Sequence, residues 1–128
     1  MKKTSPEQRR RILIVEDNEK NMYLMNFLLT KSGYEIIKCG SGEEAVETAV
    51  KEKPDLVIMD IQLPGIDGLE ATKRIRASEA DGSIPIVAVT SYAMTGDKEK
   101  VLAAGCNGYI EKPINPETFL AEVQKYIK

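Results

Sequence analysis

Five short runs of largely apolar residues are spaced along the chain, with polar segments between them. Apolar runs without polar alternation are typical of strands that are buried on both faces of a sheet. The predicted strands span residues 12–15, 35–39, 56–59, 84–89 and 108–110. The second run is partly polar, which indicates a place near an edge of the sheet. Pro85 is compatible with the fourth strand because it stands at the beginning of that strand.

The segments between these runs have helical periodicity. Helices are predicted at residues 19–31, between Ser41 and Pro54, from Asp67 to about residue 77, at about residues 95–104, and from Pro116 onward. The expected caps are Asn18, Ser41 with Glu44, Asp67 with Glu70, and Asn115. The second helix is expected to bury Ala45, Val46, Ala49 and Val50, and the last helix Phe119, Leu120, Val123 and Ile127.

Strands that alternate with helices favour the α/β class, with a parallel sheet covered by helices on both faces. Right-handed crossovers and an open sheet give a doubly wound, flavodoxin-like (βα)5 arrangement with strand order 2-1-3-4-5. In such sheets ligands bind at the carboxyl ends of the strands, beside the point where the strand order reverses. The residues that follow the strands are therefore the first candidates for function.

Length and charge limit the function further. The chain has 128 residues and is predicted to form one domain, at residues 11–128, after a basic arm at residues 1–10 that is interpreted as a solvated tail. The net charge is -2, so a dedicated nucleic-acid binder is not expected. The sequence contains neither an apolar run of roughly 20 residues nor a signal peptide, so we expect no membrane span and a cytoplasmic location.

The chain has no histidine, and its two cysteines, Cys39 and Cys106, do not form a CxxC pair. A zinc site, a Cys-His nucleophile and a Ser-His-Asp hydrolase site are therefore excluded. The same absence excludes a histidine that carries phosphate. Both cysteines lie in or beside apolar segments, and we predict that they are reduced and packed in the core.

Polar groups follow four of the predicted strands. They are Glu16 and Asp17 after the first strand, Asp60 after the third, Thr90 and Ser91 after the fourth, and Lys112 after the fifth. Carboxylates that share a site repel one another unless a cation is present. Oxygen ligands with room for water favour Mg2+. We expect Asp17 and Asp60 to bind Mg2+ directly and Glu16 to bind it through water, with a backbone carbonyl near Gln62 as a further ligand.

A lysine and a hydroxyl beside a metal site suit a phosphoryl group, because its oxygens need charge neutralised from several sides during transfer. The sequence contains neither a GxxxxGK[ST] loop nor a GxGxxG turn for a nucleotide. The phosphoryl group is therefore expected to arrive from elsewhere, and a carboxylate is the available nucleophile. Asp60 is the favoured acceptor, because it ends the central strand with Thr90 and Lys112 facing the same point.

Four segments together resemble the receiver domain of two-component response regulators: ILIVEDN, DLVIMDIQLPGIDG, IPIVAVTSYA and GYIEKPI. They occur in the right order and at the right strand ends, and the resemblance covers nearly the whole chain. It is strongest to receivers of the stand-alone type. The resemblance implies that Asp60 accepts phosphate from a histidine on a sensor kinase or a histidine phosphotransfer protein, while Glu16 and Asp17 hold Mg2+.

The resemblance also implies roles for the residues around Asp60. Lys112 would form a salt bridge with the phosphoryl group, the Thr90 hydroxyl would move toward it, and Tyr109 would turn inward into the space vacated. Ser91 occupies a position that varies among receivers. The peptide bond between Lys112 and Pro113 would be cis, although only about one X-Pro bond in twenty is cis in folded proteins.

These inferences predict a phosphorylation-driven switch that is not a turnover enzyme. Phosphorylation would alter the face formed by the fourth helix, the fifth strand and the fifth helix, where an effector protein would bind. One alternative is a receiver segment of a hybrid kinase or multidomain regulator. Another is a Mg2+-dependent phosphatase, which Gln62 disfavours because a second acid would be needed there. A third, a binding module that is never phosphorylated, is disfavoured by the complete set of acids, threonine and lysine.

Overall fold

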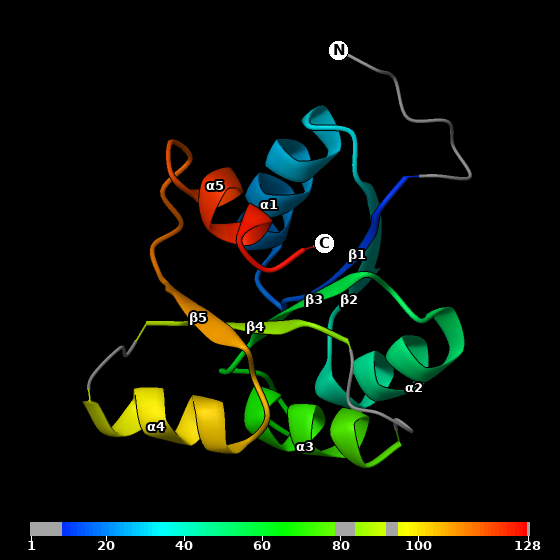
Figure 1. The fold of residues 1–128 in the computed structure, drawn as a ribbon, viewed down its shortest axis with the longest axis vertical. Helices are drawn as coiled ribbons and strands as arrows, with labels where there is room; N and C mark the ends of the chain where they lie inside the picture. The colour runs from blue at the N-terminus through cyan, green and yellow to red at the C-terminus, as the bar shows by residue number, and fades with distance from the viewer. Residues whose placement is uncertain (1–8, 79–83, 92–94, 128) are drawn as a thin grey trace.

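The computed structural model describes residues 9–78, 84–91 and 95–127. In these ranges five strands alternate with five helices (Figure 1). The strands are β1 (Arg11–Val15), β2 (Glu35–Cys39), β3 (Leu56–Asp60), β4 (Ile86–Thr90) and β5 (Gly108–Glu111). The helices are α1 (Glu19–Lys31), α2 (Gly42–Glu52), α3 (Gly68–Ser78), α4 (Thr95–Ala103) and α5 (Phe119–Gln124).

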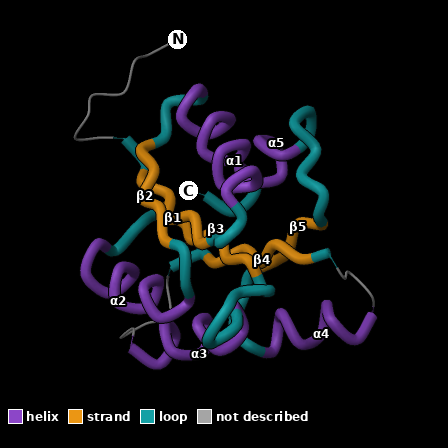
Figure 2. The backbone as a smooth tube through the Cα atoms, turned by 180° about the vertical axis from the view of Figure 1, so that it is seen from behind, coloured by secondary structure: helices purple, strands orange, loops and turns teal. Residues whose placement is uncertain are grey.

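The five strands form one parallel sheet in the order β2-β1-β3-β4-β5, which confirms the predicted topology. The partly polar strand β2 lies at an edge, as predicted. Helices α1 and α5 cover one face of the sheet, and α2, α3 and α4 cover the other (Figures 1 and 2). The chain leaves β1 in one direction for β2 and later crosses back to β3, so the strand order reverses beside β1 and β3.

The central strands are apolar throughout because helices pack on both of their faces. Leu13, Val15, Val57 and Met59 belong to the layer that includes side chains of α2 and α3. Ile12, Ile14, Leu56 and Ile58 belong to the layer that includes side chains of α1 and α5. All eight side chains are fully buried. The two layers hold β1 and β3 rigidly, which fixes the positions of the residues at their carboxyl ends.

Helix caps lie close to those same strand ends. The Asn18 side chain accepts from the N–H of Asn21 at 3.0 Å at the start of α1. The Asp67 side chain accepts from the N–H of Glu70 at 2.8 Å at the start of α3. Both caps were predicted from the sequence, and they fix where each helix leaves the loop.

The capping box of α2 differs in one bond from the predicted one. The Ser41 hydroxyl accepts from the N–H of Glu44 at 3.2 Å, as expected. The Glu44 carboxylate, however, accepts from the N–H of Gly40 at 3.0 Å, one residue before the cap. The reciprocal bond therefore ties the helix to the end of β2.

Two elements begin more than one residue away from their predicted starts. Strand β4 begins at Ile86 and not at residue 84, because Pro85 has no N–H with which to pair, although its carbonyl accepts from Val57 at 2.9 Å. Helix α5 begins at Phe119 and not at Pro116. The N–H groups of residues 118 and 119 both donate to the Asn115 carbonyl, so the segment before the helix is a separate turn.

The predicted inner faces of α2 and α5 each include one residue that the structure places elsewhere. Val50 is 47% exposed, whereas Ala49 is fully buried. The buried residues Gly42, Ala45 and Ala49 form the side of α2 that faces the core, and Val50 lies beside this side and faces solvent. Ile127 lies beyond the end of α5, although it still packs against the layer that α1 and α5 share.

Three further expectations concern the ends and composition of the chain. Residues 1–8, which make up most of the predicted basic arm, lie outside the described residues. Cys39 and Cys106 are free and buried, as predicted. Within the described ranges, the helices are too short or too polar to cross a membrane.

Candidate functional site

Parallel pairing brings the carboxyl ends of β1 and β3 together. Val15 of β1 pairs with Met59 of β3. Glu16 and Asp60, the next residue on each strand, therefore lie beside each other at one edge of the sheet. Their positions follow from the register, which is fixed because successive side chains of both strands pack alternately into the two apolar layers.

The register of β4 and β5 adds two more groups to this edge. Asp60 pairs with Val89 in β4, and Thr90 pairs with Glu111 in β5. Lys112 follows β5 directly, and its backbone N–H donates to the Thr90 carbonyl at 2.8 Å. Residues from the ends of four strands thus meet at the edge of the sheet where the sequence predicts a site.

Three carboxylates converge at this edge. Oxygen atoms of Glu16, Asp17 and Asp60 all lie within 4.8 Å of one another. Glu16 is 3% exposed and Asp60 is 1% exposed, whereas Asp17 is open to solvent. A cavity of about 270 Å³ beside helix α1 is lined by Glu16 and Asp17 together with Met22 and Tyr23, and Asp60 is not part of its lining. The acidic cluster is therefore buried at Glu16 and Asp60 and open to solvent at Asp17.

Backbone N–H groups hold two of the three carboxylates in place. The N–H of Asn18 donates to Glu16 Oε2 at 3.1 Å, and the N–H of Gln62 donates to Asp60 Oδ1 at 3.0 Å. Each bond occupies one oxygen of its carboxylate. The second oxygens, Glu16 Oε1 and Asp60 Oδ2, take no part in these two bonds and can contact other groups of the site. The backbone of Gln62 therefore lies beside the Asp60 carboxylate, and its side chain is exposed.

Lys112 supplies a cation to the two buried acids. Its Nζ lies 3.1 Å from Asp60 Oδ2 and 3.4 Å from Glu16 Oε1, and its side chain is 14% exposed. The peptide bond between Lys112 and Pro113 is cis, as the resemblance implied. The lysine thus lies on the inner side of the acidic cluster, and Asp17 lies on its outer side.

The charges of this cluster are not balanced. Burial, together with the neighbouring Asp60 carboxylate, raises the pKa of Glu16 to about 7, although the Lys112 ammonium acts in the opposite direction. Glu16 Oε1 is buried and has no hydrogen-bond partner within the described part of the chain. A divalent cation would compensate the excess negative charge and would also bind Glu16 Oε1, because such cations take oxygen ligands. The three carboxylates, all oxygen donors, suit Mg2+.

The remaining predicted site residues differ in how close they come to the acids. Thr90 is 4% exposed and lies at the same edge of the sheet as the acidic cluster, whereas Ser91 is exposed. Tyr109 is half-buried, and Nζ of Lys98 on α4 lies 5.7 Å from the centroid of its ring. The Tyr109 ring is thus associated with α4 in this structure.

Gly68 is a functional residue that the sequence pattern did not reveal. It opens α3, and its N–H donates to the Ile61 carbonyl at 3.0 Å. A Cβ at this position would lie 2.8 Å from the Ile61 Cα and closer still to the carbonyl oxygen of Asp60. Only glycine allows α3 to begin against the end of β3. The available signal was a glycine in the first turn of a helix, where better helix formers are common.

Comparisons with known proteins agree with this geometry. The family model for the response regulator receiver domain matches residues 12–124. The polar-differentiation response regulator DivK of Brucella ovis is 47% identical over 116 residues, which cover 91% of this chain and 94% of that protein. DivK of Brucella anthropi is 45% identical over the same length.

Solved structures of receivers are also similar. One is the receiver domain of the sensor histidine kinase PA1611 from Pseudomonas aeruginosa, which is described with a magnesium ion coordinated in its active site cleft. It is 36% identical to this chain with a TM-score of 0.84, and the match covers 92% of this chain and 97% of that one. The receiver domain of Ssk1 from Saccharomyces cerevisiae, crystallised with the histidine phosphotransfer protein Ypd1, is 32% identical with a TM-score of 0.84 over 92% of this chain and 88% of that one.

The family match spans all five strands and the acidic edge of the sheet, and the relatives match over nearly their whole length. The chain therefore belongs to the response regulator receiver domains, is similar to DivK, and has structural neighbours in two-component and phosphorelay systems.

Proposed function

We propose that this receiver domain takes a phosphoryl group onto Asp60 from a phosphohistidine of a partner protein. The observation that supports it most is the position of this carboxylate. Asp60 ends the central strand β3, is 1% exposed, and has Lys112 Nζ 3.1 Å from Oδ2. Two further carboxylates, Glu16 and Asp17, lie within 4.8 Å of it. A negatively charged phosphoryl group can approach an acceptor carboxylate only if nearby cations neutralise the charge. Lys112 is one such cation, and the two further carboxylates can hold a metal ion as another.

The transfer replaces one bond to phosphorus by another. An oxygen of the Asp60 carboxylate forms the new bond to phosphorus as the bond between phosphorus and the imidazole nitrogen of the donor breaks. The leaving imidazole keeps the electron pair of that bond, and with its other nitrogen protonated it departs as a neutral ring. The product is an aspartyl phosphate on Asp60.

Mg2+ is the cofactor in this proposal. Asp17 and Asp60 would bind it directly, Glu16 would bind it through water, and the backbone carbonyl of Gln62 would complete the protein ligands. The ion would neutralise charge on the phosphoryl oxygens during transfer. The magnesium ion described for the receiver of PA1611 supports this assignment.

The phosphoryl group would then be read by the residues on β4 and β5. Lys112 would contact it as a cation, and the hydroxyl of Thr90 would donate to it, with Ser91 beside them at the exposed end of β4. Movement of Thr90 would leave room for Tyr109, whose ring packs beside α4. The face formed by α4, β5 and α5 would change with it, and an effector protein would bind there.

The partner that donates the phosphoryl group would be a sensor histidine kinase or a histidine phosphotransfer protein. The complex of the Ssk1 receiver with Ypd1 supports this class of donor. The donor class also favours a cytoplasmic location, since kinases that form phosphohistidine use cytoplasmic ATP. The domain would assist its own phosphorylation and hydrolysis without acting as a turnover enzyme.

Intact-mass spectrometry after incubation with acetyl phosphate and Mg2+ tests the proposal. The wild-type protein is expected to gain one phosphoryl group, Asp60→Asn none, and the control Glu47→Gln, an exposed acid of α2, one. The gain is expected to disappear when EDTA removes the metal. A phosphorylated Asp60→Asn protein, or sustained release of phosphate from many phosphate esters, would contradict the proposal.

A further inference from the structure

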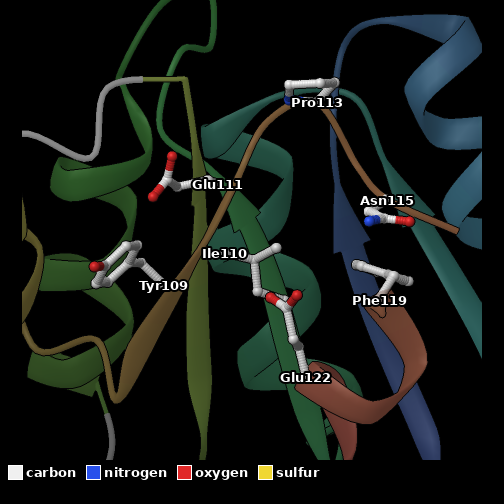
Figure 3. Close-up of a pocket in the computed structure, with 7 residues that line it drawn as sticks. All are labelled: Tyr109, Ile110, Glu111, Pro113, Asn115, Phe119 and Glu122. Carbon is white, nitrogen blue, oxygen red and sulfur yellow. The ribbon is translucent and has the colours of Figure 1, made fainter. Parts of the chain in front are cut away.

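A groove of about 270 Å³ follows β5 on the side toward α5 (Figure 3). β5 is an edge strand, so its outer side has no neighbouring strand in the sheet. Ile110 and Phe119 line the groove but are only 4% and 1% exposed, so its accessible apolar surface comes mainly from Pro113 and Tyr109. It is therefore a preformed recess with a mixed lining, more polar than apolar, on the face that the proposed effector would use.

The groove is lined by two carboxylates. Glu111 and Glu122 both line the groove, and Figure 3 shows Glu111 on the same side of β5 as Tyr109, with Glu122 on the side of α5. Neither forms an ion pair within the part of the chain that the structure describes. Acids elsewhere on the surface do, as Glu70 with Arg74 at 2.9 Å shows. The groove thus carries two negative charges without an internal cation.

Two cations close to β5 are engaged elsewhere. Lys112, next to Glu111 in the chain, points to Asp60 and Glu16 at 3.1 and 3.4 Å. Lys98 on α4 lies over the Tyr109 ring, 5.7 Å from its centroid, and pairs with neither groove carboxylate. The negative charge of the groove is therefore available to a partner.

We propose that this groove binds a protein segment that carries an arginine or lysine beside an apolar side chain. The inference deepens the proposed function and rests on it, because it assigns a chemistry to the effector that the α4, β5 and α5 face would bind. An apolar side chain would lie against Pro113 and Tyr109, and the cationic group would lie near the carboxylates of Glu111 and Glu122. The edge of β5 adds backbone carbonyls that point away from β4 and can accept from the cation or from the segment.

Other occupants fit the groove less well. An acidic peptide or a nucleic acid would meet two unpaired carboxylates of like charge. A purely apolar segment would bury both carboxylates without a partner, which is costly. A guanidinium group suits the two carboxylates, because it donates from several N–H groups in one plane and carries the opposite charge.

Two matched peptides test this proposal: acetyl-Leu-Arg-Leu-amide and its neutral analogue with citrulline in place of arginine. Each is titrated into the ¹⁵N-labelled protein, with Mg2+ present to occupy the acidic cluster, and backbone amide shifts are followed by NMR. The arginine peptide is expected to produce saturable shifts centred on residues 109–113 and 119–123. The citrulline peptide is expected to bind about two- to fivefold more weakly, the usual size of one exposed charge interaction.

Variants of the protein complete the test. The double variant Glu111→Gln, Glu122→Gln is expected to weaken binding of the arginine peptide by a similar factor, about two- to fivefold, and to leave binding of the citrulline peptide unchanged. Glu117→Gln, an exposed acid outside the groove lining, is the matched control and is expected to bind as wild type does. Dispersed amide spectra of all variants verify that they fold.

Equal binding of the two peptides, unsaturable shifts, or shifts centred outside the groove would overturn the proposal. So would undiminished binding of the arginine peptide to the double variant. The outcome is separable from the phosphorylation test. If acetyl phosphate fails to modify Asp60 but the peptides still discriminate, the groove stands as a cation-selective contact and the phosphoacceptor assignment fails.

Discussion

The ammonium of Lys112 lies 3.1 Å from Asp60 Oδ2 and 3.4 Å from Glu16 Oε1, so one cation contacts both buried carboxylates of the site. In the proposed mechanism the same ammonium contacts the phosphoryl group on Asp60. Phosphorylation would therefore redistribute an existing ion pair, and Mg2+ would compensate the carboxylate that the lysine leaves. The two cations would then neutralise three negative groups: Glu16, Asp17 and the phosphoryl group on Asp60.

Lys112→Met is expected to lower the free energy of unfolding by about 1–3 kcal/mol in the absence of metal at neutral pH, because two buried carboxylates lose their cation. Mg2+ is expected to recover part of this loss. Urea unfolding with and without Mg2+ measures both effects, and Lys125→Met, at an exposed lysine after α5, is the control. A loss that Mg2+ leaves unchanged would indicate that the lysine acts by packing alone.

The raised pKa of Glu16 predicts a pH dependence of stability in the metal-free protein. Its pKa rises from an ordinary 4.5 to about 7 on folding, so between these values the folded protein holds a proton that the unfolded chain releases. The stabilisation is complete below pH 4.5 and is lost as the pH rises through 7. The shift corresponds to roughly 3 kcal/mol or less, since Asp60 shares the titration.

The free energy of unfolding of wild type and of Glu16→Gln, measured in EDTA from about pH 5 to pH 8, isolates this contribution, because this range covers the window of the pKa shift. The wild-type protein is expected to lose stability relative to the variant as the pH increases. Parallel pH profiles for the two proteins would mean that Glu16 does not titrate in this window.

Gly68→Ala tests the close approach of α3 to the end of β3. The added Cβ would collide with the backbone of Asp60 and Ile61, so a loss of about 2–4 kcal/mol and a weaker affinity for Mg2+ are expected. Gly40→Ala is the matched control, because a Cβ at Gly40 meets nothing within 4 Å. Thermal unfolding and a Mg2+ titration measure the two effects. Equal behaviour of the two alanine variants would refute the steric argument.

Thr90→Ala separates phosphorylation from its readout. The variant is expected to gain a phosphoryl group from acetyl phosphate, because the acceptor and the metal ligands remain. The amide shifts that phosphorylation causes around Tyr109 are expected to be lost, and Thr90→Ser is expected to retain them because it keeps the hydroxyl. NMR spectra before and after addition of the phosphodonor make the comparison. Full shifts in Thr90→Ala would exclude the hydroxyl from the switch.

The sheet and most of the site were predictable because their signals are repeated and local. Five apolar runs alternate with helical segments, and polar groups such as Asp60 and Lys112 follow the runs at the end that parallel sheets use for binding. The cis bond before Pro113 came from the family resemblance alone, and the structure confirms it. The roles of Thr90, Ser91 and Tyr109 remain predictions.

The features that escaped prediction depend on three-dimensional distance. Gly68 matters because the start of α3 lies against the Asp60 carbonyl, and spacing along the chain does not encode that approach. Helical spacing predicts Val50 in the core, but the buried side of α2 is narrow and consists of Gly42, Ala45 and Ala49, so Val50 falls outside it. The turn before α5 was read as helix because Pro116 is compatible with both.

Borohydride trapping tests the central claim most directly, since it identifies the residue that carries the phosphoryl group. Sodium borohydride reduces an aspartyl phosphate to homoserine, and peptide mapping by mass spectrometry locates the product. After reaction with acetyl phosphate and Mg2+, homoserine is expected at position 60, with no homoserine at Asp17 and no 5-hydroxynorvaline, the corresponding glutamate product, at Glu16. Homoserine at another residue, or its absence from a protein that has gained a phosphoryl group, would contradict the account.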